Sequence, residues 1–338
     1  MGDRVQDPET PPRMLLVHPD AALVHRAVRA GLDVLVLTDG NGFVGLAPER
    51  VHRAGESGGT EAGIGRLVAN QGITHVLDAD GSPAWRIPPG SGPVVTEAPR
   101  LLADVRAFRQ ALASSLRAVV REHLVPVVDE VPKAVADLGG KATIVTASGE
   151  DVVDSDASLN AWMRTRRHRP AAGPFLVEEL VTGAEVVVTT LTVSGMHRVV
   201  GIVEHHRIGT RARYLYPANL PEPGAQQVRA LVTGMLDTVG YEFGPAHTRV
   251  VLTAGGPRLV SAAPRFTVHG IAGLIETATG FDLATELFRA LAGAPIEPPR
   301  ARWYTAAEFG GTSGPADAPR VAEAVSADAV WRRLDELP

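Results

Sequence analysis

The stretch FLVEELVTGAEVVVTTL, residues 175–191, decides the fold together with the sequence that follows it. Residues 185–193 (EVVVTTLTV) and 197–204 (HRVVGIVE) are rich in β-branched side chains. They flank the pair Ser194-Gly195, a sequence that suits a tight turn. This part of the chain therefore predicts a β-hairpin.

A second hairpin and a set of helices follow. Residues 248–253 and 257–262 read as strands around Gly255-Gly256. Apolar residues then recur at helical spacing in three segments, residues 222–240, 271–279 and 283–292. Hairpins combined with helices are typical of an α+β arrangement.

The sequence before residue 175 alternates between strands and helices. Short apolar runs at residues 14–17, 32–37 and 74–77 predict buried strands, with helices expected over 20–30, where Asp20 is the cap, and 61–71. This order predicts a small parallel sheet, and the Pro- and Gly-rich residues 81–99 predict a linker. Beyond the linker the pattern predicts one long helix and then shorter elements: helices over 101–124, 130–138 and 157–165, and strands over 125–128 and 142–146.

Composition excludes several kinds of protein. The 338 residues carry a formal charge of −5, so a broad basic surface for nucleic acid is not expected. No cysteine is present, which removes disulfides and thiolate metal sites. Apolar runs stay shorter than a membrane span, and residues 1–13 lack the apolar core of a secretory signal, so we expect a cytoplasmic protein. Only two of the 33 basic residues, Lys133 and Lys141, are lysines.

From residue 101 to 293 the order of elements resembles the ATP-grasp superfamily, in its carboxylate–amine ligase branch. The resemblance is carried by residues 175–191, by GYEFGPAHTRVVLTAGGPRLVSAAPR (240–265) and by GLIETATGFDLATELFRALAG (273–293). It implies an α/β (α+β) fold with a Rossmann-like domain over 13–98. It also implies a small hinge subdomain over 99–174, a C-terminal subdomain over 175–294 and a short tail over 295–338.

The resemblance also implies a nucleotide site. Such ligases use ATP to phosphorylate a carboxylate, and an amine then attacks the acyl phosphate. Glu178 and Glu179 match the hinge that binds adenine, and Glu185 matches the acidic residue that holds the ribose. ATP is therefore a candidate cofactor.

The positions that would hold Mg²⁺ have changed. Arg249 stands where the family has an acidic residue, and Ser261-Ala262-Ala263 replaces its Glu-x-Asn. Carboxylate oxygen is what Mg²⁺ prefers, so we do not expect Mg²⁺ at the usual site. The strand that should offer a lysine to the phosphates has Val145 or Thr146 at the matching place. Lys141 lies about 13 Å away along that strand, and a shift in alignment would bring it nearer.

Cationic and imidazole side chains gather where the lost groups would be. We predict a catalytic role for Arg249, Arg265 and His205, because guanidinium groups match anions and a histidine can transfer protons. The expected substrate-binding residues are Arg211, Arg213, His206, His247 and His269. Two alternatives stand beside this interpretation: Arg207, Arg211 and Arg213 are solvated loop charges, or His247 belongs to the structural motif.

Three functions are compatible with these residues. The first is an atypical ATP-grasp ligase that still holds nucleotide. The second is an ATP-independent enzyme acting on an anionic substrate in the cleft lined by Arg and His. The third is a non-catalytic pseudoenzyme that binds a ligand or a partner ligase. The expected partner is a small anionic or amino-acid-like molecule, and a homodimer is left open. No transition-metal site is predicted, because His205 and His206 are adjacent on a strand and point to opposite faces.

Overall fold

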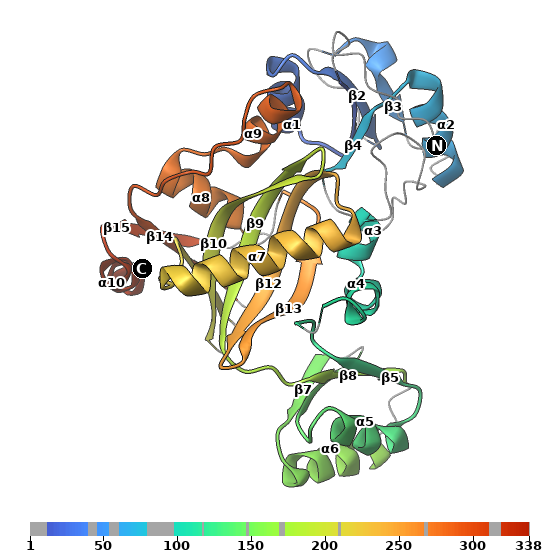
Figure 1. Cartoon of the computed structure of the whole chain (residues 1–338), viewed down its shortest axis with the longest axis vertical. Coiled ribbons are helices and arrows are strands. Elements are labelled where there is room, and N and C mark those ends of the chain that lie inside the picture. Colours follow the sequence, from blue (N-terminus) through green and yellow to red (C-terminus); the bar gives the residue numbers. More distant parts are fainter. Residues whose placement is uncertain are drawn as a thin grey trace.

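The computed structural model describes residues 12–39, 46–53, 61–79, 98–116, 118–146, 149–168, 173–208, 211–266, 270–310 and 319–337. Three sheets follow one another along the molecule in Figure 1. The predicted linker 81–99 falls outside the described residues except for its last two positions.

The N-terminal sheet is parallel, as its sequence predicts. Its strand order is β3 (Val51–Arg53), β2 (Asp33–Thr38), β1 (Arg13–Val17) and β4 (His75–Asp78). The helices α1 (Ala21–Arg29) and α2 (Glu61–Gln71) accompany these strands. Asp20 caps α1 by accepting a hydrogen bond from the backbone N–H of Leu23 at 2.6 Å. The short strand β3, which follows a 3-10 turn at Pro48–Arg50, was not predicted.

The predicted helix over residues 101–124 is wrong. The structure has two short helices, α3 (Ala98–Ala103) and α4 (Val105–Ala113), and then the strand β5 (Glu122–Val125). Asp104 separates the helices because its side chain accepts from the N–H groups of Arg106 and Ala107 and so begins α4. Further on, Val119 forms a β-bridge with Leu259 instead of continuing the helix.

The second sheet is small and lies at one end of the molecule. Its order is β5, β8 (Phe175–Glu179), β6 (Ala142–Thr146) and β7 (Gly149–Val153). The helices α5 (Val131–Asp137) and α6 (Asp156–His168) accompany it, and a 3-10 turn at Val128–Glu130 precedes α5. Phe175, Ile144 and Val177 from the strands belong to one buried cluster with Val131 from α5 and Trp162 from α6.

The third sheet has seven strands and is the centre of the fold. Its order is β13 (Gly256–Ala263), β12 (Phe243–Thr253), β9 (Ala184–Val193), β10 (Met196–Ile208), β11 (Arg211–Tyr216), β14 (Tyr304–Phe309) and β15 (Arg320–Ala324). Both predicted hairpins are present, and Ser194 and Gly195 turn the first with positive φ angles. The segment expected to be a loop with Arg207, Arg211 and Arg213 is instead the end of β10 and the start of β11. The residues after 295 contribute β14 and β15, so they extend this sheet.

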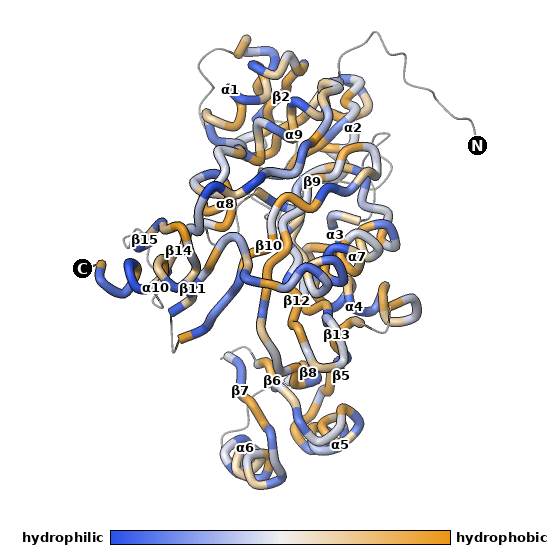
Figure 2. The backbone as a smooth tube through the Cα atoms, turned by 60° about the vertical axis from the view of Figure 1, so that its left-hand side comes forward, coloured by the Kyte–Doolittle hydropathy of each residue, from blue (hydrophilic) through white to orange (hydrophobic). Residues whose placement is uncertain are grey.

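Helices cover both faces of the central sheet. On one face, α7 (Glu222–Val239) packs on Val186, Val188 and Val250. On the other face, α8 (Ile271–Thr279) packs on Val187 and Val203, and α9 (Leu283–Leu291) lies beside it. The alternation along β9 follows the period of two in a strand. Figure 2 shows apolar residues along the central strands.

The last helix, α10 (Ala327–Glu336), packs on β14 and on the edge strand β15. Leu215, Ala306, Val330 and Leu334 form the core of this contact. Among the residues that the structure describes, no helix is both long and apolar enough to cross a bilayer.

Candidate functional site

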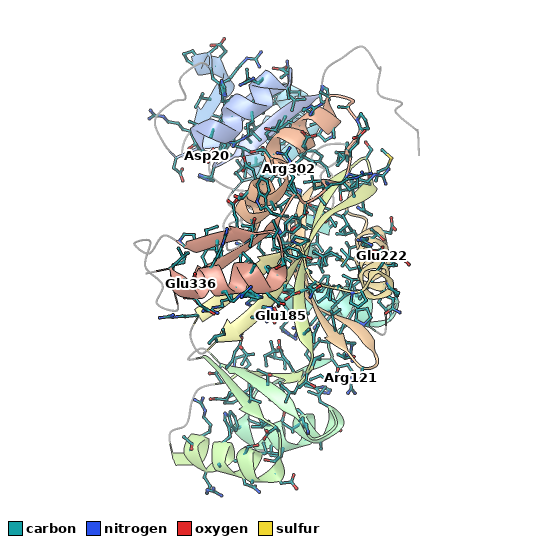
Figure 3. All side chains as sticks on the ribbon, turned by 90° about the vertical axis from the view of Figure 1, so that its left-hand side faces the viewer. Asp20, Arg121, Glu185, Glu222, Arg302 and Glu336 are labelled. Carbon is teal, nitrogen blue, oxygen red and sulfur yellow. The ribbon has the colours of Figure 1, made fainter. Side chains whose placement is uncertain are left out.

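Four polar side chains form a row across the central sheet. Arg249 is on β12, Glu185 on β9, His205 on β10 and Tyr214 on β11. Glu185 lies opposite His205 in the strand register, and His205 lies opposite Tyr214. Glu185 shares the face of Val187, because residues two apart in a strand point the same way. Figure 3 places Glu185 near the end of the central sheet that faces the small sheet.

One oxygen of Glu185 accepts two hydrogen bonds. His205 Nδ1 donates to Glu185 Oε1 at 2.8 Å, and Arg249 Nε donates to the same oxygen at 2.6 Å. Burial alone would raise the pKa of this carboxyl, but the two bonds and the charge of Arg249 outweigh burial and lower the pKa to about 2. The same contact keeps the pKa of Arg249 raised despite burial. Glu185 and Arg249 therefore form a permanent ion pair at neutral pH.

The imidazole of His205 is held in one orientation. Its ring stacks on Tyr214 with centroids 4.8 Å apart and an angle of 9° between the planes. A carboxylate can only accept, so the Nδ1 that bonds Glu185 carries the proton and neutral His205 has its lone pair on Nε2. The side chain is only 7% exposed, so its orientation is fixed by these neighbours.

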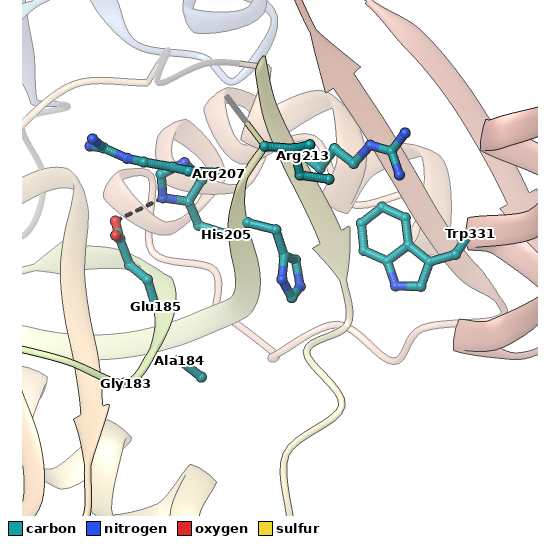
Figure 4. A pocket seen from close by; sticks show the side chains of 9 residues that line it. Gly183, Ala184, Glu185, His205, Arg207, Arg213 and Trp331 are labelled. Carbon is teal, nitrogen blue, oxygen red and sulfur yellow. Dashed lines mark hydrogen bonds and ion pairs between the residues drawn. The ribbon is translucent and has the colours of Figure 1, made fainter. Parts of the chain in front are cut away.

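A pocket of about 510 Å³ lies beside this row (Figure 4). Its wall includes Glu185, His205 and Arg207, together with His206, Arg213 and Trp331. The structure therefore brings five of the predicted site residues close to one another. Four of them are in the wall, namely Glu185, His205, His206 and Arg213, and the fifth, Arg249, is bonded to Glu185.

The two adjacent histidines, His205 and His206, bond different carboxylates. His206 Nε2 bonds Glu204 at 2.8 Å, and its ring meets the edge of Trp331 with centroids 5.5 Å apart. Successive side chains of a strand point to opposite faces, which separates His206 from the row that contains His205. Trp331 comes from the C-terminal helix α10, so this side of the pocket depends on a segment that the sequence presented as a tail.

Arg213 and Arg211 are structural partners of Glu308. Arg213 Nε bonds Glu308 at 2.5 Å and its Nη2 bonds Asp335 at 2.7 Å, while Arg211 reaches Glu308 at 3.1 Å. These contacts neutralise much of their charge and join β11 to β14 and α10. The alternative of purely solvated charges does not describe Arg213, because its partner Glu308 is buried.

The two glutamates expected at the adenine hinge are held by arginines. Arg109, which is only 4% exposed, donates to Glu178 at 2.6 Å and to Glu122 at 2.8 Å. Arg258 and Arg121 donate to Glu179 at 2.8 Å and 3.2 Å. Burial would raise the pKa of Glu179, but the hydrogen bonds from Arg258 and Arg121 lower it below its usual range.

His247 and Arg265 form no hydrogen bond to the ion pair of Arg249 and Glu185, within the residues that the structure describes. His247 is 2% exposed, with Thr189 Oγ1 at 3.0 Å from Nδ1 and the carbonyl of Phe266 at 3.1 Å from Nε2. Burial lowers its pKa to about 4, so it is a neutral core residue with both nitrogens engaged. The Nε of Arg265 is buried without a hydrogen bond to any residue that the structure describes. His269 lies outside the described residues.

The residues present do not suit Mg²⁺. Ser261 pairs with Arg249 and Ala263 with His247 in the register of β12 and β13, so neither partner offers a carboxylate. Glu185 is already bonded to a guanidinium, which would repel the ion. Lys141 immediately precedes β6 and is exposed. Within the described ranges, no group of three or more His, Asp or Glu side chains is arranged to hold a metal.

Sequence reasoning missed Tyr214, Trp331, Arg109 and Arg258. Tyr214 and Trp331 fall in segments that were expected to be a loop and a tail. The sequence does place Tyr214 two residues from Tyr216 in RARYLY, an alternation that signals a strand. Nothing local marks Arg109 or Arg258, because their partners are far away in the chain.

Comparisons with known proteins establish the fold. No family model matches the chain, and no curated protein matches it. Among solved structures, an L-amino acid ligase from Bacillus licheniformis is 16% identical, with a TM-score of 0.66 and coverage of 96% of this chain and 97% of the other. Phosphoribosylglycinamide synthetase from Anaerococcus prevotii is 12% identical, with a TM-score of 0.68 and coverage of 97% and 98%.

A third structure was solved with nucleotide. It is N5-carboxyaminoimidazole synthase from Aspergillus clavatus in complex with ADP and 5-aminoimidazole ribonucleotide. The two chains are 15% identical, with a TM-score of 0.66 and coverage of 88% of this chain and 81% of the other. At these identities the likeness concerns the fold. The predicted ATP-grasp fold is confirmed, and the three proteins that share the fold are a ligase, a synthetase and a synthase.

Proposed function

We propose that this chain binds a small anionic ligand, without a metal ion, in the cleft of its ATP-grasp fold. The observation that carries the proposal is the ion pair between Arg249 and Glu185 at 2.6 Å. It fills the two positions to which the resemblance assigns a metal ligand and the ribose contact. Anion binding is common to two of the functions named above, the ATP-independent enzyme and the non-catalytic binder.

Arg249 is suited to hold an anion. Its Nε is fixed on Glu185, and no residue that the structure describes bonds its two Nη groups. The side chain is 36% exposed, so the planar end of the guanidinium is available to a carboxylate or phosphate. A fixed cation thereby supplies a positive charge that a metal would otherwise bring.

Arg207 adds a second positive charge on the same face of β10 as His205. Its side chain is 58% exposed, and the carboxylate recorded nearest to it is Glu150, 4.0 Å from its Nη1. At that distance and exposure the pair contributes little, so Arg207 can turn to a ligand at low cost.

Binding of a simple anion tests this proposal directly. We expect inorganic phosphate to bind the full chain in the presence of a metal chelator, as measured by calorimetry and by NMR titration. Arg249→Gln should weaken binding by about tenfold or more, because a charged hydrogen bond contributes about 1.5–3 kcal/mol. Arg229→Gln, an exposed arginine on α7, is the matched control and should bind as the wild type does.

Two results would contradict the proposal. One is a failure of wild-type protein to bind phosphate or acetate at any concentration up to the millimolar range. The other is equal binding by the wild type and by Arg249→Gln when both are folded by circular dichroism.

An ATP-dependent ligase is the second candidate function. It is favoured by the fold that the chain shares with a synthase solved with ADP. The decisive assay is ADP release from ATP and Mg²⁺ with panels of acids and amines, alongside a thermal-shift screen with ATP, ADP and Mg²⁺. ADP formation that disappears in Glu185→Ala would support the ligase, whereas calorimetry without any ATP binding would exclude it.

A further inference from the structure

The row formed by Arg249, Glu185, His205 and Tyr214 displays two complementary hydrogen-bonding groups. Arg249 Nε and His205 Nδ1 both donate to Oε1 of Glu185. The outward side of the guanidinium therefore presents only donors, while the outward nitrogen of neutral His205 presents only an acceptor. Because both side chains meet at one oxygen, one small molecule can touch both.

The acceptor is fixed from several directions. Glu185 holds the proton on Nδ1, and Tyr214 stacks against the ring. Tyr214 is itself 3% exposed and meets the edge of Phe309, with centroids 5.7 Å apart. No residue that the structure describes donates to Nε2 of His205, which belongs to a side chain in the pocket wall.

We infer that Nε2 of His205 accepts a hydrogen bond from the ligand, so that the site selects anions that carry their own proton donor next to the charge. The ligand class is a 2-hydroxy carboxylate or a hydrogen phosphate: the anion lies on Arg249 and the O–H points to His205. This inference rests on the proposed anion binding and adds the specificity-determining residue.

The free acceptor predicts different affinities for two anions that differ only in whether they carry a hydrogen-bond donor. Lactate carries a hydroxyl that propionate lacks, and hydrogen phosphate carries an O–H that sulfate, a tetrahedral anion of the same charge, lacks. A site with a free acceptor gains one hydrogen bond with the first member of each pair, which corresponds to about a fivefold preference. The two pairs also separate a carboxylate ligand from a phosphate ligand.

The experiment is an NMR titration of the full chain with the four anions at pH 8, where an imidazole is ordinarily neutral and phosphate is mostly hydrogen phosphate. We expect lactate to bind about fivefold more tightly than propionate, or hydrogen phosphate more tightly than sulfate. His205→Phe should abolish the preference while retaining propionate or sulfate binding, because Phe keeps a ring against Tyr214 and lacks the acceptor. His123→Phe, an exposed histidine on β5 outside the pocket, is the control and should keep the preference.

A second readout does not depend on any variant. In the wild type the ring nitrogens of His205 should show a protonated Nδ1 and a bare Nε2, and the donor-bearing anion should shift the Nε2 signal. If neither donor-bearing anion is preferred, or if Nδ1 is the bare nitrogen, the inference fails while the anion site stands. If none of the four anions binds, the proposed function fails as well.

Discussion

Glu185 owes its pH behaviour to the two donors that share its Oε1 atom. Its pKa in the folded chain is about 2, below its ordinary value of 4.5, so the folded state binds this proton less tightly than the unfolded state. The resulting stability is present above about pH 4.5 and is lost as the pH falls towards 2.

Glu185→Gln tests this linkage. We expect the variant to be less stable than the wild type by about 3 kcal/mol at pH 7, and the gap to narrow by pH 3, because one pKa unit corresponds to about 1.36 kcal/mol. Urea unfolding at both pH values measures the gap. Glu222→Gln, an exposed partner of Arg229 on α7, should stay within about 0.5 kcal/mol of the wild type. A gap that is the same at pH 7 and pH 3 would show that Glu185 acts through packing alone.

Two buried histidines make the stability of the chain depend on pH, and they do so with the opposite sign to a histidine that gains an acidic partner. Burial lowers the pKa of His247 and of His75 to about 4, below the ordinary 6.5. Each is neutral in the folded chain and gains a proton on unfolding between pH 6.5 and 4. The free energy of unfolding therefore decreases as the pH falls from 6.5 to 4.

His247→Gln is the variant that isolates one of these groups, because a glutamine amide offers both an acceptor and a donor. We expect its free energy of unfolding to depend less steeply on pH between 6.5 and 4 than that of the wild type. Urea unfolding at pH 7, 6, 5 and 4.5 gives the slopes. His123→Gln, exposed on β5, should leave the wild-type slope unchanged. Identical slopes for His247→Gln and wild type would refute the assignment.

At the scale of elements, α10 is fastened to the sheet by arginines. Arg320 on β15 donates to Glu308 at 3.1 Å and to the carbonyl of Leu334 at 2.6 Å, and Arg213 on β11 bonds Asp335. Arg320 thus supplies donors to the C-terminal end of a helix, where backbone carbonyls lack partners. Through these contacts α10 brings Trp331 to the pocket wall.

Arg320→Ala should loosen α10. We expect amide hydrogen exchange across Ala327–Glu336 to become at least tenfold faster, while exchange in β9 and β12 stays unchanged. Arg332→Ala, an exposed arginine on the same helix, should have no such effect. Wild-type exchange rates in α10 of Arg320→Ala would mean that the apolar contact of Val330 and Leu334 suffices to hold the helix.

Some strands and helices could be predicted from the sequence, and others could not. Strands β1, β2, β6 and β9 carry continuous or β-branched apolar runs, so local pattern predicts them. Strand β11 (RARYLY) begins with charged residues that pair with Glu308, so only the alternation of Tyr214 and Tyr216 marks it, and β15 (RVAEA) is rich in alanine and carries no strong strand signal. The helix expected over 101–124 failed because apolar residues beyond Ala113 pack on the central sheet, a tertiary contact with no local signature.

In the candidate site, too, the sequence identified single residues but not the contacts between them. The resemblance picked out Glu185, His205 and Arg249 individually, from three separated segments. That Arg249 and His205 meet on a single oxygen of Glu185 depends on the register of three strands. The hinge glutamates were identified as nucleotide contacts, whereas the arginines that bond them come from distant parts of the chain.

At the scale of the whole molecule, the small sheet is joined to the central sheet through buried charge. Arg109 on α4 donates from Nε to the carbonyl of Val260 in β13 and from Nη1 to Glu122 and Glu178 in the small sheet. Arg258 on β13 reaches Glu179 in the same strand as Glu178. These two arginines therefore join the small sheet to β13 of the central sheet.

Arg109→Met should release this connection. Removing one partner of a buried pair leaves the carboxylates of Glu122 and Glu178 without their buried cation, a loss of about 3–5 kcal/mol. Arg106→Met removes only the half-exposed contact with Glu122 and should lose less than about 1 kcal/mol. The triple variant Arg109→Met, Glu122→Gln, Glu178→Gln removes the stranded charges and should recover part of the stability. If hydrogen exchange in β5 and β8 is as slow in Arg109→Met as in the wild type, the charges do not hold the two sheets together, and other contacts between the sheets suffice.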